Sequence, residues 1–97
     1  MQFILEEDRA LAKRCKWERP LLPFHANDTA AELLLIHVCE VWGERTEWDY
    51  HQDIEYGFWV ILLDETTKLS FSASALTFAG AACLAIKGFL DGLGVYY

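Results

Sequence analysis

The 97-residue chain lacks the short motifs that mark common enzymes. It contains no GxSxG elbow, no P-loop and no GxGxxG sequence, which argues against the usual hydrolase, nucleotide and dinucleotide sites. Its three cysteines, Cys15, Cys39 and Cys83, are widely spaced and form no CxxC pair. An odd, scattered set of this kind favours reduced thiols in a cytosolic setting over a disulfide framework.

The chain is also short of positive charge. Eight lysines and arginines stand against 15 acids, so the net charge is −7. Residues 40–65 hold eight acids and only Arg45, so this segment alone carries a charge equal to that of the whole chain. The basic residues at 9–19 are balanced by neighbouring acids and do not make a nucleic-acid footprint. The negative charge of residues 40–65 repels nucleic acid and attracts basic surfaces.

Signals for export or membrane insertion are weak. The opening "MQFILEED" has no positively charged region of the kind that begins a signal peptide. Eighteen uncharged residues between Lys68 and Lys87, "LSFSASALTFAGAACLAI", are long enough for a membrane helix, which is the alternative here. Their serines and weakly hydrophobic alanines favour a strand end followed by a buried helix. We therefore expect no membrane partner and a location in the cytoplasm of a host cell.

The hydrophobic pattern switches from a helical to a strand period along the chain and predicts one α+β domain over residues 1–97. The expected fold is a three-stranded antiparallel meander packed with two or three helices. Helices are predicted over residues 4–17, 29–43 and 74–90, and strands over residues 45–51, 55–64 and 67–72, with a strand at 2–5 as the competing interpretation. The cap candidates of the second helix are Asn27, Asp28 and Thr29, and Thr29 and Glu32 have the spacing of a capping box. Ser72 or Ser74 is expected to cap the last helix.

The predicted central strand, "EYGFWVILLD", is almost wholly apolar, as expected for a strand covered on both faces. If the helices cover only one face, Trp59, Ile61 and Leu63 are left exposed. An exposed apolar patch usually marks an interface. The protein would then be a homo-oligomer or a phage assembly component.

Asp49, His51 and Asp53 share one face of a strand and have the residue types of a metal site. An HxD pair of this kind needs a second, distant histidine. The other histidines are His25 and His37, and the apolar surroundings of His37 indicate a core residue. Because the ligand set is incomplete, we expect no metal, no cofactor and no enzymatic activity.

The stretch "TEWDYHQDIE" places Glu47, Asp49, Asp53 and Glu55 at odd positions. Side chains on one face of a strand stand about 6.6 to 6.8 Å apart, which is of the order of the spacing between neighbouring phosphates. A solvated sheet face explains the alternation, but like charges close together across a sheet cost stability. A row of carboxylates at this spacing can instead bind the lysine and arginine side chains with which another protein contacts DNA phosphates. The predicted binding residues are Glu44, Glu47, Asp49, Asp53, Glu55, Asp64 and Glu65, all expected to project into solvent.

In its size, its single α+β domain and the acidic run "ERTEWDYHQDIE" followed by "LDE", the chain resembles the small acidic inhibitors of phages and mobile elements, which include anti-CRISPR proteins that mimic DNA. The resemblance implies a non-enzymatic inhibitor. Its partner would be a basic nucleic-acid-binding protein, such as the DNA-binding channel of a CRISPR surveillance complex. A mimic of this kind is expected to be a monomer, with a dimer as the alternative.

Overall fold

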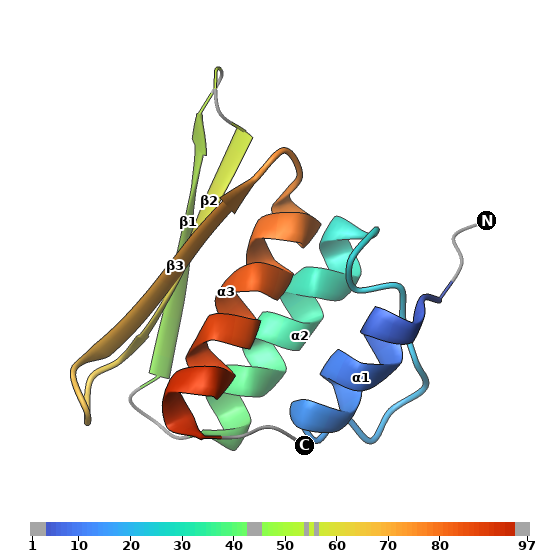
Figure 1. Ribbon diagram of the computed structural model, residues 1–97, viewed down its shortest axis with the longest axis horizontal. Helices are drawn as coiled ribbons and strands as arrows, with labels where there is room; N and C mark the ends of the chain where they lie inside the picture. Colours follow the sequence, from blue (N-terminus) through green and yellow to red (C-terminus); the bar gives the residue numbers. More distant parts are fainter. Residues whose placement is uncertain (1–3, 43–45, 54, 56, 95–97) are drawn as a thin grey trace.

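The computed structural model describes residues 4–42, 46–53, 55 and 57–94. It contains helices α1 (Glu6–Arg14), α2 (Asp28–Val41) and α3 (Phe78–Leu93) and strands β1 (Thr46–Asp53), β2 (Gly57–Asp64) and β3 (Leu69–Ala75). The strands form an antiparallel meander in the order β1-β2-β3. All three helices lie on the same side of this sheet (Figure 1). The predicted α+β fold is therefore confirmed.

The boundaries of the elements differ from the predicted ones by a few residues. The predicted first strand ends at residue 51, which puts the first turn near Gln52 and Asp53. β1 instead runs on to Asp53, which pairs with Gly57, so the turn lies after Asp53. The sequence "DETT" at residues 64–67 indicates the second turn, which the structure places at residues 65–68. β3 continues to Ala75, and α3 therefore begins at residue 78 instead of residue 74. The uncharged stretch is thus a strand followed by a helix, as predicted.

The central strand β2 is covered on one face only. Val60 and Leu62 face the helices and are fully buried. Trp59, which points to the opposite face, is 42% exposed. The prediction that both faces of this strand are covered is wrong. α3 packs on β2 and β3, α2 packs on α3 and β1, and α1 packs on α3. In the described part of the chain, all helices therefore lie on one side of the sheet (Figure 1).

Small residues let α3 lie close to the sheet. Gly92 faces the Phe71 ring so closely that an added Cβ would stand 2.1 Å from its outermost carbon. Phe71 in turn meets Phe89 edge to face, with ring centroids 6.0 Å apart. Alanines make up much of the buried surface of α3, namely Ala79, Ala81, Ala82 and Ala85. These small side chains let the helix backbone approach the sheet closely.

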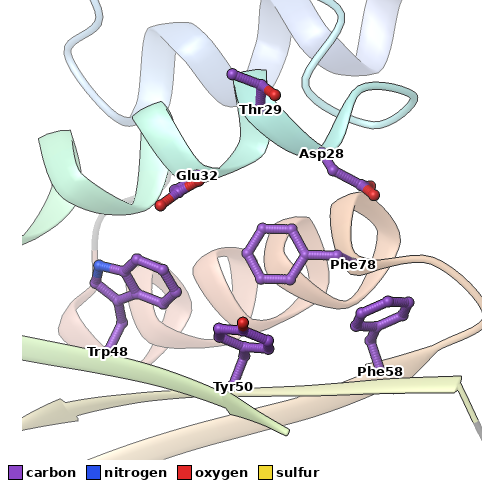
Figure 2. Close-up of a pocket in the computed structure, with 7 residues that line it drawn as sticks. All are labelled: Asp28, Thr29, Glu32, Trp48, Tyr50, Phe58 and Phe78. Carbon is purple, nitrogen blue, oxygen red and sulfur yellow. The ribbon is translucent and has the colours of Figure 1, made fainter. Parts of the chain in front are cut away.

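An aromatic cluster fixes the first turn of α3 against the sheet. Phe78, the first residue of the helix, contacts Trp48 and Tyr50 of β1 and Phe58 of β2 (Figure 2). The ring centroids lie 6.1, 5.5 and 6.1 Å from that of Phe78. Aromatic pairs at these separations contribute beyond the area that they bury.

α2 begins one residue earlier than its sequence indicates. The side chain of Asn27 accepts a hydrogen bond from the Ala30 backbone N–H at 2.9 Å and is the N-cap. The predicted capping box of Thr29 and Glu32 is therefore wrong, because both residues already lie inside the helix. Asn27 was one of three adjacent cap candidates, and local sequence alone ranks them poorly.

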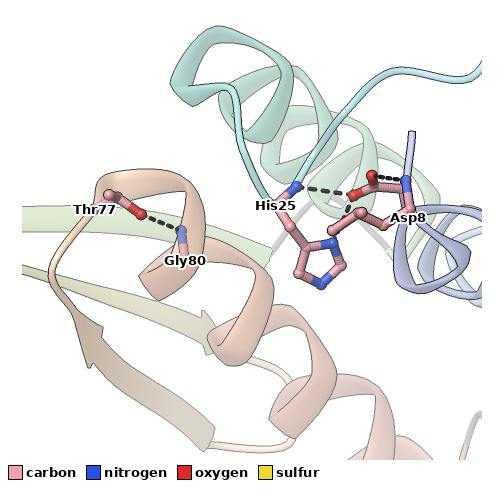
Figure 3. Close-up of polar contacts among 5 residues, drawn as sticks. Asp8, His25, Thr77 and Gly80 are labelled. Atoms are coloured by element: carbon pink, nitrogen blue, oxygen red, sulfur yellow. Dashed lines mark hydrogen bonds and ion pairs between the residues drawn. The ribbon is translucent and has the colours of Figure 1, made fainter. Parts of the chain in front are cut away.

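The start of α3 is held by two side chains. Thr77 accepts from the Gly80 backbone N–H at 3.0 Å, so Thr77 is the N-cap in place of the predicted Ser72 or Ser74 (Figure 3). Asp28, the first residue of α2, accepts from the Ala79 backbone N–H, also at 3.0 Å. This bond joins the beginnings of the two helices.

Asp8 ties α1 to the proline-rich segment that follows it (Figure 3). Its carboxylate is fully buried and accepts from the Leu5 backbone N–H at 2.8 Å and the His25 backbone N–H at 2.9 Å, while His25 Nδ1 lies 2.6 Å away. Burial alone would raise the pKa of Asp8, but these hydrogen bonds outweigh it and hold that pKa below its usual 3.8. The sequence presents Asp8 only as one of three acids near the helix start.

Replacing Asp8 with Asn should lower the free energy of unfolding by roughly 3 kcal/mol at pH 7, because buried donors lose a charged acceptor. The native state holds the proton on Asp8 less tightly than the unfolded state does. Wild-type stability should therefore fall as the pH drops below about 5. Urea unfolding between pH 7 and pH 3 should show a shallower loss for Asp8→Asn. Glu7→Gln, at an exposed neighbour, is the control, and an equal pH slope in Asp8→Asn and wild type would contradict this account.

Candidate interaction surface on the outer sheet face

The face of the sheet turned away from the helices is here called the outer face. Strand register places three rows of side chains on it, one from each strand. The rows are Glu47, Asp49, His51 and Asp53 on β1, Trp59, Ile61 and Leu63 on β2, and Ser70, Ser72 and Ser74 on β3. An acidic row thus runs beside an apolar row, which runs beside a row of serines.

Glu47 and Asp49 are exposed in the acidic row. Glu47 lies opposite Leu63 and Asp49 lies opposite Ile61, so each carboxylate has an apolar neighbour across the sheet. The three strands contain no lysine or arginine, and neither acid forms an ion pair with a residue that the structure describes. These two charges are therefore available to a basic partner.

Asp53 and Glu55 lie at the first turn. Asp53 is half-buried, and one of its oxygens accepts from the Glu55 backbone N–H at 2.8 Å. Glu55 is exposed in the turn itself. Asp53 thus shares the outer face with Glu47 and Asp49, while Glu55 lies beyond the end of the row. Glu44, also a predicted binding residue, lies outside the described residues.

Asp64 does not belong to this surface. It pairs with Thr46, lies on the helix side of the sheet and is only 8% exposed. Its oxygens accept from the Thr66 backbone N–H and the Thr67 hydroxyl, each at 3.0 Å. The prediction that Asp64 projects into solvent is wrong, because its even position in the strand turns it inward. Its neighbour Glu65 is exposed in the second turn.

The apolar row is not covered by a described helix, as the sequence predicts for the case in which the helices cover only one face. Trp59 is exposed and Ile61 and Leu63 are half-buried. At one end of the face, a hollow of about 270 Å³ forms between Trp59, His51 and Ser74. The sequence predicts exposure of the apolar row only on the condition that the helices pack on one face. Local sequence patterns do not determine which face the helices cover.

The other polar candidates have structural partners or are buried. His37 Nε2 lies 2.8 Å from the Cys15 carbonyl oxygen and its ring meets Trp17 edge to face. His37 is therefore held by structural contacts, but it is half-buried and does not lie in the core as expected. Burial raises the pKa of Cys15 and Cys83 to about 12 and that of Cys39 to about 11. The reactive thiolate is therefore scarce at neutral pH.

Among the residues described, no group of three or more histidines, cysteines and acids is arranged to hold a metal ion. Within the same part of the chain, no helix is long and apolar enough to cross a membrane. Comparisons with protein-family models, curated proteins and solved structures found no match. Function is therefore inferred from the surface itself.

Substitution of the buried acid Asp64 should lower the unfolding free energy more than substitution of the exposed acid Glu47. Asp64→Ala removes the acceptor of two hydrogen bonds in a turn and should cost about 1 to 3 kcal/mol of unfolding free energy. Glu47→Gln changes an exposed side chain and should stay within about 0.5 kcal/mol of wild type. Urea unfolding at pH 7 measures both. Equal effects of the two substitutions would contradict the distinction.

Proposed function

We propose that the protein is a non-enzymatic inhibitor whose outer face mimics a nucleic-acid backbone and occupies a basic protein surface. The observation that carries this proposal is the exposure of Glu47 and Asp49 on a sheet whose three strands, as far as the structure describes them, contain no lysine or arginine. Their spacing along the strand, about 6.6 to 6.8 Å, suits lysines and arginines placed to grip successive phosphates.

The apolar row strengthens the case for a protein partner. Leu63 and Ile61 flank the two acids, so a partner contacts carboxylates and apolar surface together. Lysine and arginine side chains offer both chemistries, since their stems cover apolar surface while their charged ends reach carboxylates. A DNA-binding channel rich in such side chains fits this face, and the channel of a CRISPR surveillance complex is the example that the sequence resemblance supplies.

A homo-oligomer is the second candidate, and the exposure of Trp59 in the apolar row favours it. Self-association through this row would depend on apolar burial and would persist at high salt. Sedimentation equilibrium distinguishes the two candidates. A mimic should sediment as a monomer, and Trp59→Ser should leave its mass unchanged. A salt-resistant dimer that Trp59→Ser dissociates would establish the second candidate instead.

Reversing the charges of Glu47 and Asp49 should abolish binding while the fold survives. Loss of charge contacts that are buried in the complex costs about 2 to 5 kcal/mol of binding free energy. Exposed substitutions should shift the unfolding free energy by no more than about 0.5 kcal/mol. The measurement is a pull-down from host lysate with wild type and Glu47→Lys/Asp49→Lys, in low and high salt and with competing DNA.

The matched control is Glu7→Lys/Glu18→Lys, which makes the same charge change at exposed positions on or just after α1, away from the sheet. It should retain the partner. The partner bound by wild type should be released by salt and by DNA. Full-strength capture by the outer-face variant at low salt would refute the mimic and leave the acids as a solvated face.

A further inference from the structure

A second concave surface lies on the helix side of the sheet, where α2 passes over β1. It is a cleft of about 230 Å³. Four aromatic side chains and two carboxylates line it, namely Trp48, Tyr50, Phe58 and Phe78 with Asp28 and Glu32 (Figure 2). None of these residues lies on the outer face, so the cleft is separate from the proposed inhibitory surface.

The rings form the floor and one wall of the cleft. Trp48 and Tyr50 are two residues apart on the same face of β1, and their ring centroids lie 6.3 Å apart. The two ring planes differ by only 27°. Phe78 stands at 77° to Tyr50. Tyr50 is 54% exposed although it lies on the helix side of the sheet. Aromatic surface is therefore presented to a ligand from more than one direction.

Carboxylates from α2 face these rings across the cleft. Glu32 is exposed and lies over Trp48 (Figure 2). Asp28 also reaches the cleft, but one of its oxygens accepts the Ala79 backbone N–H. Among the residues that the structure describes, no lysine or arginine lines the cleft. Negative charge above aromatic faces favours a cation, because the face of an aromatic ring is itself negative.

We propose that this cleft binds an alkylated ammonium cation. Alkyl groups on the nitrogen fill the apolar space between the rings, while the charge interacts with the ring faces and with Glu32. An unalkylated ammonium is more strongly hydrated and gains less from the same cleft. An anion would be repelled, and a neutral apolar ligand would cover the carboxylate without compensating its charge.

The same chemistry occurs in a free small molecule and in a methylated lysine of a partner protein. Three probes test the shared chemistry and separate the sources: choline, its neutral carbon analogue 3,3-dimethylbutan-1-ol, and a short peptide containing trimethyllysine. Each is titrated into ¹⁵N-labelled protein and followed by NMR. Choline or the peptide should shift the Trp48 indole N–H saturably, with a dissociation constant of about 1 mM or below.

Charge should account for part of the affinity. The neutral analogue should bind at least about 5-fold more weakly than choline, which is the size expected from a cation over aromatic rings. Glu32→Gln and Tyr50→Leu should each weaken binding of the cation by about 3-fold or more. Both side chains are exposed, so the fold should survive. Because Tyr50 contacts Phe78 in the first turn of α3, unchanged amide signals in the later turns of α3 verify this. Glu40→Gln, on the same helix but outside the cleft, should bind as wild type does.

Equal binding of choline and its neutral analogue would overturn the proposal, since the cleft would then be merely apolar. So would the lack of a saturable shift with both cationic probes, or undiminished binding by Glu32→Gln and Tyr50→Leu. Tighter binding of the trimethyllysine peptide identifies a partner side chain as the source of the cation. Tighter binding of choline identifies a small molecule.

Discussion

The packing of all three helices on one face of a three-stranded sheet determines the rest of the structure. Alternate residues of each strand face opposite sides, so this arrangement divides β2 into a buried set, with Val60 and Leu62, and an uncovered set, with Trp59 and Ile61. The same division separates Glu47, which meets solvent, from Asp64, which does not. One-sided coverage thus produces both the core and the outer face.

Close packing of α3 makes this coverage possible. With glycine at position 92, the Phe71 ring fits against the helix, and a row of alanines lets the helix backbone approach the strands. At the other end of α3, Phe78 is anchored among the rings of β1 and β2, and Asp28 connects that end to α2. The residues that fix α3 therefore also build the aromatic cleft beneath α2.

Periodicity was enough to predict the elements and their order, because α2, β1 and α3 each have a long, regular pattern. It was not enough to choose between cap candidates such as Asn27 and Thr29, which differ by one or two residues and depend on the path of the chain before the helix. Burial of Asp8 was also missed, because its partner His25 is 17 residues away. Contacts of this kind arise only once the helices are placed.

The candidate surface was predictable in part for the same reason. Odd positions in β1 share a face in any strand, so Glu47, Asp49 and Asp53 were grouped correctly. Asp64 was included by charge alone, although the register with Thr46 turns it inward. The cleft was not foreseen, because its rings and carboxylates come from four separate elements.

The proposed function requires that a basic partner covers the outer face of the sheet. Carboxylate footprinting tests this most directly: exposed acids are labelled with a carbodiimide and an amine, first in the free protein and then in the captured complex, and are located by mass spectrometry. Glu47 and Asp49 should be labelled in the free protein and protected in the complex, while Glu7 and Glu18 should be labelled in both. Equal labelling of Glu47 and Asp49 in the two states, with protection elsewhere, would contradict the proposed function.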